Sequence, residues 1–191
     1  MNANQNIAEF FKTEFPLNTE GLEEFLNFFR TEVYQKNSML LMEGEREDRL
    51  RFLNKGIVRE YYAAEGRETN INFYTSPQFL TDFVAFNNGK PSRKYQQCLT
   101  TVEMKSVQKE VFLKHMNKYD CGKEVVEKTF KKLLTFKETF EYNRITKSAE
   151  MLYMDILTHK PHWLQHIPQY HIASYLGVKP ETLSRIRKRI S

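Results

Sequence analysis

The 191-residue sequence has few cysteines and no long apolar run, and each absence excludes a class of protein. Its two cysteines, Cys98 and Cys121, are too few for a disulfide framework, and an iron–sulfur cluster normally needs four thiolates. No apolar stretch approaches the roughly 18–20 residues that cross a bilayer. The N-terminal stretch has neither the basic nor the apolar region of a signal peptide. We therefore expect a cytoplasmic protein that has no membrane partner.

Sequence motifs of enzymes are also missing. We find no nucleophile elbow, P-loop, dinucleotide fingerprint or metal-hydrolase motif. Four histidines gather in one connection, but no cysteine or carboxylate completes a zinc-binding set locally: His159, His162, His166 and His171. The sequence thus predicts no enzyme activity, no metal site and no cofactor. With 40% hydrophobic and 28% charged residues, it is typical of one sizeable globular domain or two small ones.

The segment 168–190 reads as two short helices joined by a tight turn. Gly177 can adopt the positive φ that such a turn requires, and Pro180 suits the first turn of the second helix. Small Ala173 lies four residues before Gly177, and apolar Leu183 lies six residues after it. This spacing is typical of a helix-turn-helix, whose second helix enters the DNA major groove.

The charge of this segment agrees with DNA binding. Residues 168–191 contain five basic residues and one acidic residue, which is +4 of the chain's net charge of +5. A basic end on an otherwise balanced chain is the pattern of a phosphate-binding module. An ordinary basic helical hairpin remains the alternative.

Between residues 38 and 109 the pattern changes to short apolar or alternating runs separated by turn residues. Strands this short with turns this regular favour an antiparallel sandwich or a small barrel. The runs are Met39–Met42, Leu50–Leu53, Ile57–Ala63, Asn70–Tyr74 and Gln97–Met104.

A long helix is expected between residues 121 and 146, where no proline occurs. Apolar residues recur there at spacings of three and four, which predicts a coiled-coil seam and a homodimer: Val126, Phe130, Leu133 and Phe140, with Lys137 interrupting the seam. Packing of this helix on its own sheet domain remains the alternative.

The order of these segments resembles a known family. An apolar strand leading into Glu43-Gly44-Glu45, then LRFLNKGIVREYY and then EGRETNINFY, resembles the β-roll of the Crp/Fnr family of bacterial regulators. Together with the helix-turn-helix, the resemblance covers essentially the whole chain. It implies an α+β fold with an N-terminal antiparallel β-roll (1–118), a long dimerisation helix (119–146) and a C-terminal helix-turn-helix (147–191). Because little sequence lies between the helices of the last part, its wing should be reduced or absent.

In this family the β-roll binds a cyclic nucleotide through Gly-Glu and, about ten residues later, Arg-Ser or Arg-Thr. Here Leu80-Thr81 and Tyr95-Gln96 occupy those places, and a phosphate removed from water needs a charge-assisted partner. We therefore expect no usual binding of cyclic AMP and name no other effector. The candidate pocket residues are Thr81, Asp82, Phe83, Arg93, Tyr95 and Gln96; their aromatic neighbours could equally belong to the core.

The second helix of the C-terminal pair carries the candidate DNA-reading residues. Glu181, Ser184 and Arg185 match the Glu-x-x-Ser-Arg of the Fnr-like branch of the family. Arginine can hold guanine O6 and N7, and a carboxylate can accept from cytosine N4. Glu181 and Arg185 could also brace each other. The full candidate set is Lys179, Glu181, Thr182, Ser184, Arg185 and Lys188, with one or two of the histidines as further backbone contacts.

The sequence thus predicts a homodimeric transcription regulator that binds an inverted-repeat operator in double-stranded DNA, with RNA polymerase as a candidate further partner. The alternative is a cyclic-nucleotide-binding or other small-ligand-binding protein without specific DNA recognition. The operator, the effector, the regulated genes and the choice between activation and repression are left open.

Overall fold

The computed structural model describes residues 3–14, 19–75, 77–118 and 122–190. Two four-stranded antiparallel sheets form a roll, with strand orders β1-β8-β3-β6 and β2-β7-β4-β5. The strands are β1 (Arg30–Tyr34), β2 (Met39–Leu41), β3 (Arg49–Lys55), β4 (Val58–Ala64), β5 (Arg67–Tyr74), β6 (Gln78–Phe79), β7 (Tyr95–Cys98) and β8 (Val102–Gln108). The antiparallel β-roll predicted from the sequence is confirmed.

One predicted strand is in fact two. The run 97–104 was expected to be continuous, but residues 99–101 form a turn between β7 and β8. There the hydroxyl of Thr100 accepts a hydrogen bond from the Ile57 backbone N–H at 2.9 Å. The turn contains neither glycine nor proline, so the usual signal was absent.

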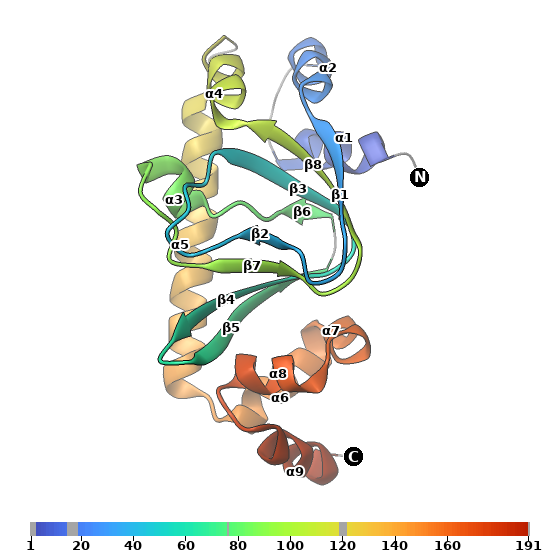
Figure 1. Ribbon diagram of the computed structural model, residues 1–191, viewed down its shortest axis with the longest axis vertical. Helices are drawn as coiled ribbons and strands as arrows, with labels where there is room; N and C mark the ends of the chain where they lie inside the picture. The colour runs from blue at the N-terminus through green and yellow to red at the C-terminus, as the bar shows by residue number, and fades with distance from the viewer. Residues whose placement is uncertain (1–2, 15–18, 76, 119–121, 191) are drawn as a thin grey trace.

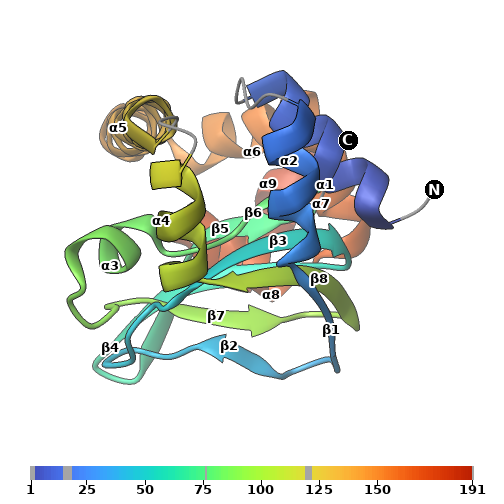
Figure 2. The same ribbon diagram turned by 90° about the horizontal axis from the view of Figure 1, so that it is seen from above.

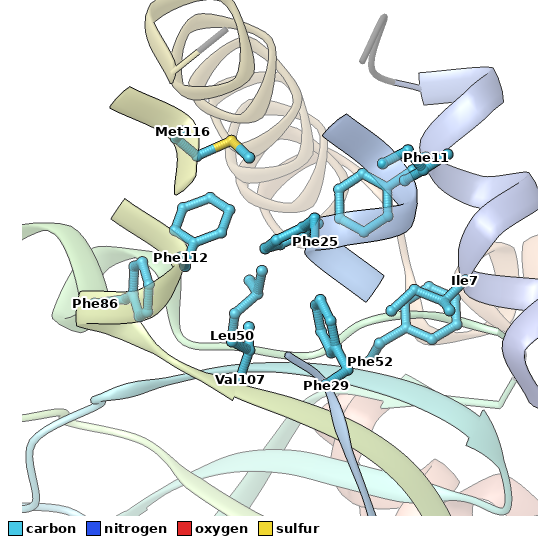
Figure 3. Packing of buried hydrophobic residues seen from close by; sticks show 11 residues of the cluster. Ile7, Phe11, Phe25, Phe29, Leu50, Phe52, Phe86, Val107, Phe112 and Met116 are labelled. Carbon is cyan, nitrogen blue, oxygen red and sulfur yellow. The ribbon is translucent and has the colours of Figure 1, made fainter. Parts of the chain in front are cut away.

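Helices cover one end of the roll. These are α1 (Ala3–Glu14), α2 (Thr19–Asn27) and α4 (Lys109–Lys118), which pack on the sheet that contains β3 and β8. Figure 3 shows how phenylalanine rings from the helices and the strands meet in this core. The Phe11 and Phe25 rings lie 5.2 Å apart, edge to face, and neither side chain is exposed by more than 1%. Such pairs add attraction to the apolar area that they bury.

The helix α3 (Phe83–Asn88) joins the roll's edge to the loop before β7. Phe86 is buried in the core beneath α4, and Phe79 and Phe83 pack partly buried against the same cluster. Phe79, Phe83 and Phe86 therefore belong to this core, as the sequence alternative held.

The long helix α5 (Gly122–Thr146) follows α4 and runs along the side of the roll. Seen from above, α5 lies at the edge of the molecule, away from α1 and α2 (Figure 2). Among the described helices, none is long and apolar enough to span a membrane.

Four shorter helices complete the chain: α6 (Ala149–His159), α7 (Pro161–His166), α8 (Gln169–Leu176) and α9 (Pro180–Ile190). Figure 1 shows them below β4 and β5. The hydroxyl of Ser148 caps α6 by accepting from the Met151 N–H. The connection before α8 is the short helix α7, and no strand occurs in the described part of the chain after β8.

Candidate functional site

The turn between α8 and α9 is closed by backbone hydrogen bonds at Gly177. This residue has φ +72°, and its N–H reaches the carbonyl of Ser174 at 3.1 Å. The next N–H, of Val178, reaches the carbonyl of Ala173 at 3.0 Å. The pattern satisfies the last carbonyls of α8 and turns the chain sharply into α9. The positive φ expected at Gly177 is confirmed.

Helix α9 has one buried face and one exposed face. Leu183 and Ile186 are buried in a cluster with residues of α6, α7 and α8. The opposite face presents side chains at positions i, i+3, i+4 and i+7, which share one side of a helix: Glu181, Ser184, Arg185 and Lys188, all exposed. Lys179 and Thr182 are exposed beside them. The structure thus brings together all six candidate DNA-reading residues at one surface.

The cations on this face have no ion-pair partner among the residues that the structure describes. Among the described residues, Lys179, Arg185 and Lys188 make no ion pair, and the expected pairing of Glu181 with Arg185 is not formed. Arg189 is different, because it pairs with Glu150 of α6 at 2.8 Å. That pair ties α9 to α6 and leaves the exposed face open.

The interior of the roll contains a second set of charges, which are paired. Arg51 on β3 donates to both carboxylate oxygens of Glu47 at 2.6 Å, and both side chains are almost fully buried. Burial raises the pKa of Glu47, and Arg51 counteracts this effect. The same carboxylate accepts the backbone N–H of Asp82 at 3.3 Å, which joins the loop before β3 to the start of α3.

Asp82 is the N-cap of α3. Its Oδ1 accepts from the N–H of Val84 at 3.2 Å and of Ala85 at 3.5 Å, and its Oδ2 accepts from the Ser92 hydroxyl at 2.8 Å. Lys94 Nζ lies 3.6 Å from Oδ1. The side chain of Asp82 is therefore occupied by the local backbone, Ser92 and Lys94.

Lys94 connects this cap to Glu60 on β4, with an N···O distance of 2.9 Å. Glu60 also accepts from the Tyr74 hydroxyl at 2.7 Å and from Gln96 Nε2 at 3.1 Å. Burial alone would lower the pKa of Lys94, but Glu60 and Asp82 outweigh it and raise that pKa. Burial, followed by the charge of Glu60, raises the pKa of Tyr74. Lys94 therefore stays cationic and Tyr74 stays neutral at ordinary pH.

We call this set the roll network: Glu47, Arg51, Glu60, Tyr74, Asp82, Ser92, Lys94 and Gln96. It contains three carboxylates and two cations, so it is negative overall. Sequence reasoning missed Glu47, Arg51, Glu60, Tyr74, Ser92 and Lys94. For Arg51 and Glu60, the available signal was a charge inside a predicted strand, because a buried charge needs a partner.

The predicted effector-pocket residues have different surroundings. Asp82 and Gln96 belong to the roll network, whereas Thr81 is pinned to β3 by accepting the Arg51 N–H at 2.8 Å. Arg93 is exposed. Tyr95 stacks on Tyr61 at 5.1 Å.

The predicted dimer seam on α5 meets its own chain in part. Phe140 lies 6.4 Å from the Tyr175 ring of α8, and Leu133 is half-buried. Val126 and Phe130 lie outside the residues whose side chains the structure describes. Leu134 and Ile145, which are 63% and 76% exposed, are further apolar side chains of α5 that the sequence reasoning missed.

Three of the histidines in the α6–α8 connection contact the protein. His162 Nε2 lies 2.7 Å from the Thr75 hydroxyl, and His166 Nδ1 lies 2.9 Å from the carbonyl of His162. His171 is buried against β5. Burial and the nearby Arg59 lower the pKa of His171 to about 4, so its ring is neutral at ordinary pH.

Comparison with known proteins agrees with this architecture. Residues 31–119 match the family model of the cyclic nucleotide-binding domain. None of the curated proteins matches the chain in sequence.

Solved structures with a similar fold include three proteins from different bacteria. FixK2 from Bradyrhizobium japonicum has a TM-score of 0.72 and 18% identity, over 85% of this chain and 84% of that chain. The c-di-GMP responsive global regulator CLP from Xanthomonas campestris has a TM-score of 0.71 and 14% identity, over 91% of each chain. The catabolite activator protein of Thermus thermophilus has a TM-score of 0.54 and 13% identity, over 92% of this chain and 84% of that chain.

The matched segment begins one residue into β1 and ends just beyond α4, so it spans the whole roll. The likeness to these solved structures covers 91% and 85% of the chain, so it extends beyond the matched segment. The chain therefore has a cyclic nucleotide-binding domain of antiparallel β-roll fold followed by several helices, in an architecture that matches that of the Crp/Fnr regulators.

Proposed function

We propose that the protein is a homodimeric, sequence-specific DNA-binding transcription regulator. The observation that carries this proposal is the exposed face of α9, where Glu181, Ser184, Arg185 and Lys188 stand on a helix whose other face is buried. The helix pair α8–α9 has the tight turn of a helix-turn-helix, in which the second helix reads base edges. Lys179, Arg185 and Lys188 are exposed and make no ion pair among the described residues, so they are available to DNA phosphates.

Within this proposal the six residues have two roles. Arg185 holds a guanine and Glu181 a cytosine, whereas Lys179 and Thr182 contact phosphates. Ser184 and Lys188 complete the contact surface. Because two identical helices read two half-sites, the operator is an inverted repeat with centres about one helical turn, roughly 34 Å, apart.

Dimerisation is proposed from α5. Leu134 and Ile145 are eleven residues apart, so they lie on one face of the helix, where both are exposed in the single chain. A second copy of α5 would cover these two side chains, and the predicted seam through Leu133 lies beside Leu134. Light scattering should show a dimer for the wild type and a weakened dimer for Leu134→Glu with Ile145→Glu. Thr139→Glu, which adds the same charge on another face of α5, serves as the control, and a monomeric wild type would refute this part of the proposal.

The roll is proposed to bind no cyclic nucleotide in the usual way. A cyclic phosphate would meet the three carboxylates of the roll network, and the cations there are already paired with them. The alternative function, a small-ligand-binding protein without DNA recognition, is favoured only by the family match of the roll.

A binding selection on random duplexes tests the main proposal. The wild type should enrich an inverted repeat, and Arg185→Ala should lose about 1–3 kcal/mol of binding free energy and relax the preference at one base of each half-site. Arg46→Ala, at an exposed arginine in the loop before β3, is the matched control and should leave the motif unchanged. If the wild type enriches no motif, the proposed function is wrong.

A further inference from the structure

Helix α8 is hydrogen-bonded to the edge of the roll. In the sheet order β2-β7-β4-β5, strand β5 lies at an edge. The hydroxyl of Ser174 on α8 accepts the backbone N–H of Asn70 at 3.1 Å and donates to the carbonyl of Glu68 at 2.8 Å. One serine side chain thus makes two of the hydrogen bonds that a neighbouring strand would make.

The same strand holds the start of α8. Asn70 is buried, and its Nδ2 donates to the carbonyl of His171 at 3.2 Å. The His171 ring completes the contact, because its Nδ1 lies 3.4 Å from Asn70 Nδ2 and 3.5 Å from Arg59 Nη1. Arg59 is itself fixed by Glu68 at 2.6 Å. Polar groups on β4 and β5 are therefore matched to polar groups on α8.

Apolar packing joins the two parts beside these hydrogen bonds. The Phe73 ring of β5 lies 4.9 Å from the Trp163 ring of α7 and 5.9 Å from the Tyr175 ring of α8. Ile57 and Phe73 belong to the same buried cluster as Leu183 of α9. The roll and the C-terminal helices consequently share one hydrophobic core.

Arg144 at the end of α5 holds the other end of α8. Its Nη1 donates to the carbonyl of Tyr175 at 2.6 Å, near the C-terminus of α8, where a cation is favourable. A Cβ added at Gly177 would lie 3.2 Å from the Arg144 guanidinium. Arg144 therefore lies directly against the turn that leads into α9.

We infer that Ser174, Asn70 and Arg144 are positioning residues, which hold α8 on β5 and α5 and thereby set the half-site spacing that the regulator accepts. The inference rests on the proposed function. None of these contacts covers the exposed face of α9, and α9 is joined to the docked helices by its buried face and by the Arg189–Glu150 pair. When the two reading helices of a dimer are already fixed in place, one operator spacing is favoured. Binding then also avoids the entropy cost of ordering the helices. Loosening the docking should weaken binding at that spacing and widen the range of accepted spacings.

The test uses inverted repeats whose half-site centres are moved by single base pairs around the best wild-type spacing. Ser174→Ala and Arg144→Gln are measured separately. If one variant fails to fold, the other still tests the inference. Each should lose affinity at the best spacing by about five- to tenfold, the effect of one or two hydrogen bonds. At the neighbouring spacings the loss of affinity should be smaller. The ratio of the affinity at the best spacing to the affinity at the neighbouring spacings should therefore fall. Ser38→Ala and Arg46→Gln are the matched controls outside the docked surface, and their ratios should equal that of the wild type.

A variant that was only less stable would lower affinity at every spacing alike, because its active fraction alone would change. An unchanged ratio in both variants overturns the inference while the proposed function stands. A wild type that binds no DNA overturns both.

A second readout needs no DNA. Trp163 is the single tryptophan of the chain, it is 2% exposed, and it lies at the docked surface. Acrylamide should quench its fluorescence weakly in the wild type and more strongly in Ser174→Ala and Arg144→Gln. Equal quenching in the wild type and both variants would show that these residues do not hold the helices in place.

Discussion

The interior of the roll and the outer face of α9 contain the same kinds of charged residue in opposite situations. In the roll, Arg51 is buried and Lys94 is half-buried, and they are paired with carboxylates at 2.6 and 2.9 Å. On α9, Arg185 and Lys188 are exposed and, within the described residues, unpaired. A buried charge that loses its partner is costly, whereas an exposed charge costs little and remains available to a ligand. The first set should therefore govern stability, and the second should govern DNA binding.

Removing a cation from the roll should have the largest effect. Arg51→Met leaves Glu47 buried without its partner and should lower the free energy of unfolding by about 3–5 kcal/mol. Urea unfolding measures the change. Arg46→Met, at an exposed site, should change stability by less than about 0.5 kcal/mol.

A double variant sharpens this test. Glu47→Gln together with Arg51→Met removes both charges and keeps an acceptor for the Asp82 N–H, so at least about half of the lost stability should return. If the double variant is no more stable than Arg51→Met, the cost does not come from an unpaired buried carboxylate.

Acid should weaken the docked surface through His171. The pKa of this ring is lowered to about 4, first by burial and then by Arg59, whereas an unfolded histidine titrates near 6.5. Between these values the unfolded chain binds the proton and the folded chain does not, so stability falls as the pH decreases from about 6.5 to 4. The loss should reach roughly 2–3 kcal/mol relative to His171→Gln, which does not titrate. Unfolding curves of both proteins at several pH values measure this loss. If the unfolding free energies of the two proteins changed equally with pH, this account would be wrong.

Removing an exposed cation from α9 should weaken DNA binding and leave stability nearly unchanged. Lys179→Ala should weaken binding to all DNA sequences alike and reduce the slope of log affinity against log salt by about one. Its unfolding free energy should change by less than about 0.5 kcal/mol. A loss confined to one sequence would instead assign Lys179 to a base.

The smallest expected effect is that of cyclic AMP or cyclic GMP on the roll. Because the roll network is negative and internally paired, calorimetry should detect no binding tighter than about 0.1 mM. A saturable micromolar isotherm would mean that the network opens to admit a phosphate.

The elements that local signals define were predictable from the sequence. Gly177 and Pro180 marked the α8–α9 turn, and the alternating runs marked β2 to β5. Short elements held by tertiary contacts were not predictable. Helix α3 depends on the Asp82 cap, and β6 contains two residues paired with β3.

The candidate sites also differ in how far the sequence could predict them. The residues of the exposed face of α9 could be named in advance, because the Glu-x-x-Ser-Arg resemblance identified them and helical spacing puts them on one side. The roll network joins residues from 47 to 96, which meet only when the sheets have formed. On α5, spacing identified an apolar stripe but could not tell which part meets Tyr175 of the same chain.

The docking of α8 on β5 also bears on how the protein avoids aggregation. An edge strand with uncovered N–H and carbonyl groups is a template on which another chain can add a strand. Here the Ser174 hydroxyl occupies two of those groups, and the helices α7 and α8 cover the strand's apolar face at Phe73. A fragment that ended after α5 would present this edge to its neighbours. The C-terminal helices thus protect an edge strand that could otherwise pair with another chain. Their proteolytic loss should produce a protein that self-associates through its sheets.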